Sequence, residues 1–266
     1  MDHPDIELVA AGYDAVYYAY PSSPTLQRIW RENACGLDYP WEFGHISFVT
    51  LAEITRMAQE LNLDNNDTLV DLGCGMGGPG LWIARETGAD VIGVDASHVA
   101  VTLATARAAD TGLSARSRFV QGTFSRTGLN NGSAAGAISI DALQYAPDKD
   151  AALAETARVV RPGGRLVFAA FELEPARVEG LPVLGADPVD DYAPRLEVAG
   201  FTVDSYAETP QWAERLAAAY GGVLDARDVL TGEMGESAFA ALESELSVTL
   251  QLRPYRRRVL AVTTRR

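Results

Sequence analysis

The alternation of apolar and polar positions predicts strands and helices that follow one another along the chain. A β-branched, apolar run at residues 68–72 leads into a glycine cluster, as expected of a buried strand that enters a tight turn. Apolar positions then continue in a helical pattern from Pro79 until Gly88, a residue type that commonly ends helices. A second apolar run at residues 91–94 follows this helix. Strands that alternate with helices in this way predict a parallel sheet and an α/β fold.

The same alternation continues through most of the remaining chain. We expect helices over residues 46–61, 98–110, 148–160, 210–220 and 236–250. We expect further strands over residues 118–121, 137–141, 166–171, 201–206 and 257–263. With the two apolar runs described above, the chain can supply seven strands.

Two stretches do not show this alternation of strands and helices, one near the N-terminus and one after the fifth expected strand. Tyrosines and tryptophans crowd residues 13–41, whereas prolines and glycines interrupt residues 175–200. We expect a helical lid over residues 1–45 and a main domain over residues 46–266, with an elaboration at about 173–250. The aromatic rings of the lid either pack its helices onto the domain or line a pocket for a small ligand.

Composition narrows the range of partners. The 266 residues are 47% hydrophobic and carry a formal net charge of −14. Nucleic acids and anionic membranes require clustered positive charge, so we expect neither as a partner. Cys35 and Cys74 are far apart and lack metal-binding spacing, so we expect no disulfide framework and no metal site. The acidic start of the chain has no basic signal region, which favours a cytoplasmic protein.

The glycine cluster has the spacing of a nucleotide-binding turn. Gly73, Gly75 and Gly78 satisfy the G-x-G-x-x-G pattern, in which the backbone approaches a nucleotide at the start of a helix. Asp95 ends the second strand about 20 residues later, where a carboxylate can accept hydrogen bonds from a ribose diol. Asp71, beside the turn, would repel a diphosphate but attract a sulfonium or ammonium centre. The pattern therefore favours a cationic adenosine derivative over a dinucleotide.

Three segments together resemble class I S-adenosylmethionine-dependent methyltransferases. They are Val-Asp-Leu-Gly-Cys-Gly-Met-Gly-Gly at residues 70–78, Val-Ile-Gly-Val-Asp-Ala-Ser at 91–97, and Arg-Pro-Gly-Gly-Arg-Leu at 161–166. The resemblance covers roughly residues 45–172. It implies a Rossmann-like three-layer sandwich with a seven-stranded, mostly parallel sheet whose last strand is antiparallel. It also implies S-adenosyl-L-methionine as the cofactor and S-adenosyl-L-homocysteine as its product.

The resemblance assigns cofactor-binding residues as well. Members of the family often have an acidic residue after the third strand that bonds the adenine amino group, whereas this sequence has Gly122, Thr123 and Phe124. The expected cofactor-binding residues are Asp71, Gly73, Cys74, Gly75, Asp95, Ala96, Ser97, Gly122, Thr123, Phe124 and Asp141.

The acceptor side is expected between the lid and the end of the fourth strand. His45 stands at the join of lid and domain, and its imidazole could remove a proton from an acceptor near neutral pH. The alternative is a core histidine bonded to a backbone group, which leaves Asp141 or Tyr145 as the polar partner of the acceptor. The catalytic candidates are therefore His45, Tyr145 and Asp141. The candidate substrate-binding residues are Tyr13, Tyr17, Trp41, Phe43, Gln144, Tyr145 and Phe171.

We expect an enzyme that transfers a methyl group to oxygen, nitrogen or carbon of a small organic acceptor in natural-product biosynthesis, as a monomer or homodimer. Such an in-line displacement depends mainly on positioning. Three alternatives remain: a cyclisation or rearrangement on the same fold, an NAD(P)-dependent oxidoreductase, and a non-catalytic protein that binds the cofactor. Asp71 argues against the oxidoreductase, because its carboxylate would face a diphosphate.

Overall fold

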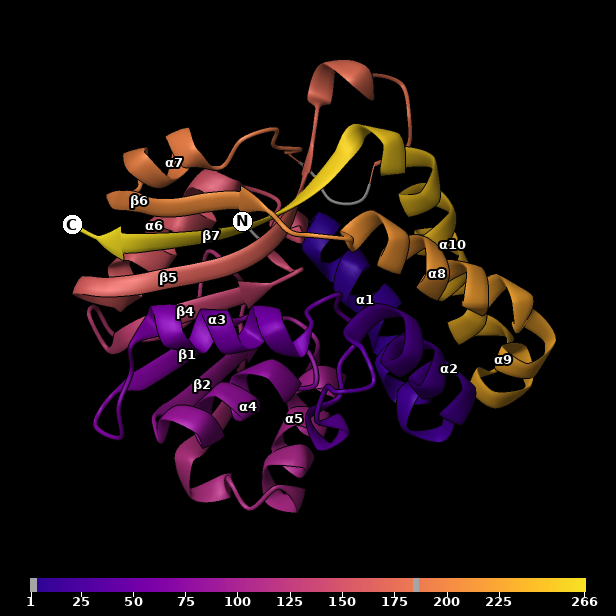
Figure 1. Ribbon diagram of the computed structural model, residues 1–266, viewed down its shortest axis with the longest axis horizontal. Helices are drawn as coiled ribbons and strands as arrows, with labels where there is room; N and C mark the ends of the chain where they lie inside the picture. The colour runs from indigo at the N-terminus through magenta and orange to yellow at the C-terminus, as the bar shows by residue number, and fades with distance from the viewer. Residues whose placement is uncertain (1–3, 184–186) are drawn as a thin grey trace.

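A seven-stranded sheet runs through the centre of the computed structural model, which describes residues 4–183 and 187–266 (Figure 1). The strands lie in the order β3-β2-β1-β4-β5-β7-β6, and β7 runs antiparallel to both of its neighbours. The other neighbouring strands pair in parallel. The strands are β1 (Thr68–Leu72), β2 (Asp90–Asp95), β3 (Ser117–Gln121), β4 (Ala134–Ile140), β5 (Val160–Leu173), β6 (Phe201–Glu208) and β7 (Arg256–Arg265). The predicted Rossmann-like sheet is confirmed.

Helices cover both faces of the sheet, which gives three layers (Figure 1). Successive residues of β1 point to opposite faces of the sheet. Leu69 packs in an apolar cluster with α3, α4 and α5 on one face, and Val70 packs in another cluster with α6 and α7 on the other face. These helices are α3 (Leu51–Leu61), α4 (Gly78–Thr87), α5 (His98–Asp110), α6 (Lys149–Val159) and α7 (Ala193–Val198).

The helix expected from residue 46 begins only at Leu51. Thr50 caps it, because the Thr50 hydroxyl accepts the Glu53 N–H at 3.3 Å and the Glu53 carboxylate accepts the Thr50 N–H at 3.1 Å. Residues 46–49 therefore remain outside the helix, and the Phe48 N–H reaches the end of β4.

Two other boundaries differ from the expectation. β5 begins at Val160, ahead of the expected residue 166, because Val160 already pairs with Ala134 across an irregularity in the ladder. In the C-terminal part of the chain, the helix expected over residues 210–220 runs to Asp225, and a separate helix, α9, follows it.

Five helices from the two ends of the chain pack together beside the carboxyl ends of the parallel strands (Figure 1). We call them the cap: α1 (Pro4–Ala19), α2 (Pro24–Ile29), α8 (Trp212–Asp225), α9 (Arg227–Met234) and α10 (Glu236–Leu252). α1 packs against α10 and α5, and α2 packs against α8 and α9. The lid expected over residues 1–45, of which 1–3 lie outside the described residues, is thus only one half of this layer. The boundary at residue 45 stays a prediction.

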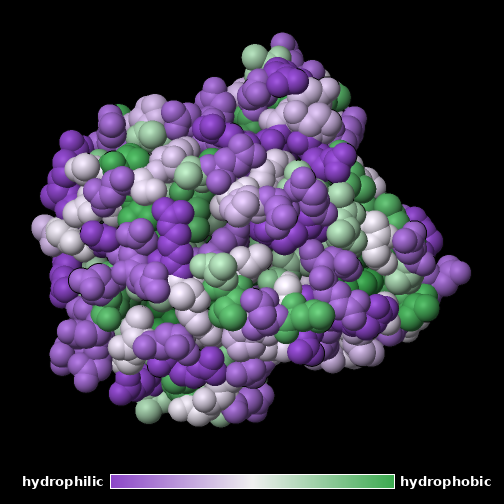
Figure 2. Space-filling model, in the orientation of Figure 1, coloured by the Kyte–Doolittle hydropathy of each residue, from purple (hydrophilic) through white to green (hydrophobic). Residues whose placement is uncertain are grey.

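Hydrophilic residues predominate on the face of the molecule seen in Figure 2, where apolar residues form small separate groups. Larger apolar side chains gather in the interior clusters instead. Within residues 4–183 and 187–266, no helix has the length and apolar character needed to cross a bilayer. The same residues contain no group of three or more His, Cys, Asp or Glu arranged to hold a metal ion.

Candidate active site

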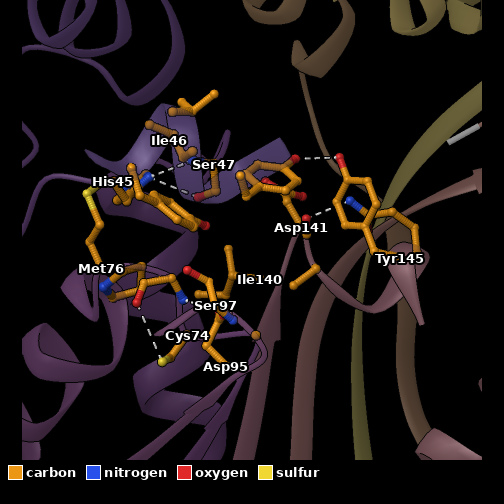
Figure 3. Close-up of a pocket in the computed structure, with 18 of the residues that line it drawn as sticks. His45, Ile46, Ser47, Cys74, Met76, Asp95, Ser97, Ile140, Asp141 and Tyr145 are labelled. Carbon is orange, nitrogen blue, oxygen red and sulfur yellow. Dashed lines mark hydrogen bonds between the residues drawn. The ribbon is translucent and has the colours of Figure 1, made fainter. Parts of the chain in front are cut away.

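One cavity lies between the carboxyl ends of the strands and the cap, and Figure 3 shows part of its wall. Its two ends differ in chemistry. The glycine turn and the loops after β2 and β3 line one end, and aromatic side chains from the cap, together with Phe48 and Phe171, line the other. The cavity therefore joins the expected nucleotide site to a second, largely aromatic end, which we call the aromatic chamber.

The glycine turn presents bare backbone to the cavity at Gly73 and Gly75. Gly73 and Gly75 adopt φ of 70° and 50°, a left-handed conformation that side chains disfavour. A Cβ added at Gly73 would lie 2.5 Å from the Ala142 Cβ, and one at Gly75 would lie 3.0 Å from the Tyr17 Oη. The bare backbone leaves room for a ligand close to the turn, and Cys74 lies between the two glycines at the cavity wall.

Asp95 is held in place by two backbone groups. The Gly75 N–H donates to its Oδ2 at 2.8 Å, and the Ser97 N–H donates to its Oδ1 at 2.9 Å. Burial raises the pKa of this carboxyl, and the two donated hydrogen bonds oppose that effect. Each oxygen keeps a lone pair for a further donor, such as one hydroxyl of a ribose. Ser97 also bonds Asp14 of α1, which fastens the cap to this loop.

Asp71 is a buried carboxylate that lacks a full set of partners. Its side chain borders the cavity, the residue is 2% exposed, and no hydrogen bond from the described part of the chain reaches Oδ2. Burial and the nearby charge of Asp95 raise the pKa of Asp71 to about 7. A cation in the cavity would relieve both effects, so the pair of carboxylates suits a positively charged ligand.

The loop after β3 completes this end of the cavity. The Gly122 N–H donates to the Asp95 carbonyl at 2.9 Å, and the Thr123 backbone closes a turn with Arg126. Phe124 packs its ring beside Gly73 and contributes a flat apolar surface to the wall. Ala96, from the loop after β2, lines the same end.

Asp141 borders the cavity, but its carboxylate is engaged elsewhere. Arg258 donates to both oxygens at 2.7 and 3.2 Å, and the Phe48 N–H donates to Oδ2 at 2.8 Å. Arg258 is fully buried and also pairs with Glu53. The Asp141 carboxylate therefore joins β4, β7 and residues 46–50. These donors hold the carboxylate, and the expectation that Asp141 meets an acceptor directly stays a prediction.

His45 lies at the cavity wall (Figure 3), as expected, but with an environment that keeps it neutral. Burial, followed by the positive charges of Arg107 and Arg258, lowers its pKa to about 3. The Ser47 N–H donates to Nδ1 at 3.1 Å, so the ring proton lies on Nε2. A ring with this pKa is a poor proton acceptor near neutral pH. The geometry favours the alternative of a core histidine bonded to a backbone group.

The candidate substrate-binding residues divide into two groups. Tyr13, Tyr17, Gln144, Tyr145 and Phe171 line the cavity.

Trp41 and Phe43 do not belong to the cavity wall, which corrects the expectation for these two residues. The short turn that they form packs against α4 instead. The Arg85 guanidinium lies 4.4 Å from the centroid of the Phe43 ring, and the Phe43 carbonyl occupies the space that a side chain at Gly78 would need.

Sequence reasoning missed several wall residues of the aromatic chamber, above all Glu245 on α10. The Glu245 Oε1 lies 2.9 Å from the Tyr13 Oη and 3.0 Å from the Tyr145 Oη. The sequence did mark Glu245 as unusual, because it shares one helical face with Leu242, Leu246 and Thr249. A charged residue is not expected on such a largely apolar face. The other missed wall residues include Trp30, Phe48, Leu216, Tyr220 and Arg256.

Comparison with known proteins identifies the family. A methyltransferase domain model matches residues 70–168. Methyltransferase GfsG of Streptomyces halstedii is 30% identical over 196 residues, which cover 70% of this chain and 69% of that protein. The chain belongs to the class I S-adenosylmethionine-dependent methyltransferases. This methyltransferase uses S-adenosylmethionine and acts on a small organic acceptor, so the oxidoreductase alternative is set aside.

Two further matches extend over most of the methyltransferase. The 27-O-demethylrifamycin SV methyltransferase of Amycolatopsis mediterranei is 27% identical over 223 residues, which cover 80% of each chain. Among solved structures, the [4+2]-cyclase SpnF superposes with a TM-score of 0.74 at 20% identity, covering 97% of this chain and 95% of that one. This second likeness is one of fold.

Proposed function

We propose that this methyltransferase transfers the methyl group of S-adenosylmethionine to a hydroxyl oxygen of a small, largely apolar molecule, in natural-product biosynthesis. The observation that carries the proposal is one continuous cavity, which runs from the carboxylate of Asp95 to an aromatic chamber that contains the carboxylate of Glu245. A relative supports this acceptor class, because the name of the 27-O-demethylrifamycin SV methyltransferase places the accepting atom at an oxygen.

The cofactor end of the cavity suits a cationic nucleoside. When bound, S-adenosylmethionine supplies an electrophilic methyl group on a positively charged sulfur. Asp95 would accept hydrogen bonds from the ribose hydroxyls, and the bare backbone at Gly73 and Gly75 would let the ligand lie close to the turn. Asp71 would contribute negative charge, and Phe124 a flat surface for the adenine.

The chamber beyond Tyr17 suits an apolar acceptor. Aromatic and aliphatic side chains supply most of its wall, and a few polar groups remain to orient a ligand. The polar groups are Gln144, Tyr145, Tyr13, Glu245, Thr249 and Arg256. This composition favours a hydroxylated hydrocarbon framework over a nucleotide or a peptide.

Matched pairs of acceptors test this function. Each pair consists of a phenol or macrolide alcohol, including 27-O-demethylrifamycin SV, and the methyl ether of the same hydroxyl. The proposal predicts formation of S-adenosylhomocysteine, and a product heavier by one methyl group, only from the free hydroxyl.

Three other outcomes would contradict the proposal. Equal turnover of the methyl ether would show that the accepting atom is not the hydroxyl oxygen. An altered product of unchanged mass, without formation of S-adenosylhomocysteine, would favour the cyclisation or rearrangement alternative. Absence of turnover with every pair would contradict methylation of this acceptor class.

A further inference from the structure

Three polar groups from distant parts of the chain meet in the aromatic chamber. Tyr13 comes from α1, Tyr145 from the short helical turn Leu143–Tyr145, and Glu245 from α10. Both tyrosine hydroxyls lie within 3.0 Å of the same carboxylate oxygen, Glu245 Oε1, and 2.9 Å from each other. Figure 3 shows Tyr145 facing this side of the cavity, with a dashed line at its hydroxyl. Two cap helices and a loop of the sheet domain thus converge on one carboxylate.

The two oxygens of Glu245 differ in how they are used. Oε1 accepts from both tyrosines, whereas no donor to Oε2 is found among the residues that the structure describes. Glu245 lines the cavity, so Oε2 is open to a ligand there. An ionised carboxylate accepts hydrogen bonds at both oxygens, and a ligand hydroxyl can supply the donor that is lacking.

Among these three groups, Glu245 is the one whose side chain can accept a proton, because the two tyrosines keep theirs. Burial and the charge of Glu245 raise the pKa of Tyr13 and of Tyr145 well above the usual value, so both remain protonated donors. Burial also raises the pKa of Glu245, whereas the hydrogen bonds from the tyrosines and the charge of Arg256 on β7 lower it. Tyr220 of α8 faces the same group and stays neutral.

The other carboxylates at the cavity wall either lie at the cofactor end or are already paired. Asp71 and Asp95 lie at the glycine turn, and Asp141 is paired with Arg258. Tyr17 stands between the two ends, because its ring lies 5.6 Å from that of Tyr13 and, besides burial, the charges of both Asp95 and Glu245 raise its pKa. Glu245 is therefore the carboxylate on the acceptor side of Tyr17.

We propose that Glu245 is a catalytic base that binds the acceptor hydroxyl at Oε2 and removes its proton, while Tyr13 and Tyr145 hold the carboxylate through Oε1. This inference rests on the proposed function. In the balanced step, the acceptor oxygen forms a bond to the methyl carbon as the carbon–sulfur bond breaks, and the electron pair of that bond stays on sulfur. The hydroxyl proton passes to Glu245 and later to water.

A first test uses a phenol and no cofactor. 4-Nitrophenol changes its absorption on ionisation, so its apparent pKa can be measured when it is bound to the wild type, to Glu245→Gln and to Glu243→Gln. Glu243 is a matched control, because it lies on the same helix but pairs with Arg227 outside the cavity. A carboxylate beside the phenol hydroxyl disfavours the phenolate, so Glu245→Gln should lower the apparent pKa by about one unit or more relative to the other two proteins.

Two results of the titration would overturn the proposal. The same apparent pKa in the wild type and Glu245→Gln would show that the phenol does not meet Glu245. A wild type that fails to bind 4-nitrophenol would show that the chamber does not take an aromatic hydroxyl.

A second test uses the hydroxyl acceptor that the matched pairs identify. Glu245→Gln should lose about 100-fold or more in kcat and lose the acidic limb of the pH–rate profile, whereas its affinity for S-adenosylhomocysteine should match the wild type. Glu245→Asp should recover part of the loss. Full turnover by Glu245→Gln would overturn the base assignment and leave the proposed function intact, whereas failure of the wild type to methylate would contradict the function itself.

Discussion

Gly75 and Gly112 both have a left-handed backbone but differ in what surrounds them. A Cβ at Gly75 would lie 3.0 Å from the Tyr17 hydroxyl, whereas one at Gly112 would meet nothing within 4 Å. Gly75→Ala and Gly112→Ala should each lose about 1 to 2 kcal/mol of unfolding free energy in urea, because of the backbone conformation. Only Gly75→Ala should also weaken S-adenosylhomocysteine binding in calorimetry. Equal affinities in the two variants would contradict the close approach of a ligand to this turn.

His45 predicts a dependence of stability on pH. Its pKa is about 3 in the folded protein, against an ordinary value of 6.5. The unfolded chain therefore binds a proton first on acidification, and the stability associated with the neutral ring is lost as the pH falls below 6.5. One proton corresponds to about 1.4 kcal/mol per pH unit, so acidification from pH 6.5 to 5 should cost the wild type about 2 kcal/mol more than His45→Gln.

Urea unfolding at several pH values would measure this difference. His98→Gln provides the control, because His98 is exposed at the start of α5. Parallel pH dependence in the wild type and His45→Gln would contradict the neutral, buried state of His45.

At the scale of single residues, the sequence could place together those candidates that local spacing holds together. Gly73, Gly75 and Asp95 lie within about 20 residues of one another, and the structure brings them to the same cavity. The ion pair of Asp141 could not be predicted, because its partner Arg258 lies 117 positions away in the sequence and meets Asp141 only in the folded chain. The sequence marks Glu245 as an acid on an apolar helical face, but its tyrosine partners, from α1 and from the turn Leu143–Tyr145, meet it only in the folded chain.

Among the elements, a buried ion network joins α3, β7 and the end of β4. Arg258 is fully buried between the carboxylates of Asp141 and Glu53. Arg258→Leu should destabilise the fold by about 3 to 5 kcal/mol, because two carboxylates would remain buried without their cation. Arg28→Leu removes an exposed helical pair and should cost less than about 1 kcal/mol. Similar urea midpoints for the two variants would contradict a structural role of the network.

The seven strands could be predicted because their apolar runs and the intervening helices are regular, whereas their order in the sheet was not predicted and is seen only in the structure. The start of α3 could not be placed from periodicity, because apolar residues precede Leu51 as well. Its position depends on the capping box at Thr50 and on the Phe48 N–H, which Asp141 holds at the end of β4. A contact with a distant strand thus decides where a local pattern ends.

For the whole molecule, the interlocked cap predicts that the N-terminal segment cannot be removed. α1 and α2 cover apolar side chains of α8, α9 and α10, and these residues form one cluster with the core. Deletion of residues 1–45 should expose this surface and abolish a cooperative unfolding transition, with aggregation seen by light scattering. Substitution of exposed Tyr18 by Ser should leave the transition unchanged. A soluble truncated protein that still binds S-adenosylhomocysteine would instead support a separable lid.

The packing of the two ends of the chain into one cap could not be inferred from the sequence. Aromatic crowding indicated that residues 13–41 face either a core or a pocket, and both descriptions hold, because Trp30 is buried and also borders the cavity. The pairing of the two ends of the chain depends on apolar faces separated by some 200 residues, for which periodicity carries no information.

Calorimetric binding of S-adenosylhomocysteine to Asp95→Ala tests the central claim, that the carboxyl ends of β1 and β2 hold the cofactor at the mouth of the acceptor chamber. Asp90→Ala is the control, because Asp90 is exposed at the opposite end of β2. Each charge-assisted hydrogen bond to a ribose hydroxyl contributes about 1.5 to 3 kcal/mol. In the variant, water can bond the ribose hydroxyls and so offset part of this loss. Asp95→Ala should therefore bind about 2 to 3 kcal/mol more weakly than the wild type, with Asp90→Ala unchanged. Equal affinity of Asp95→Ala and the wild type would contradict the account.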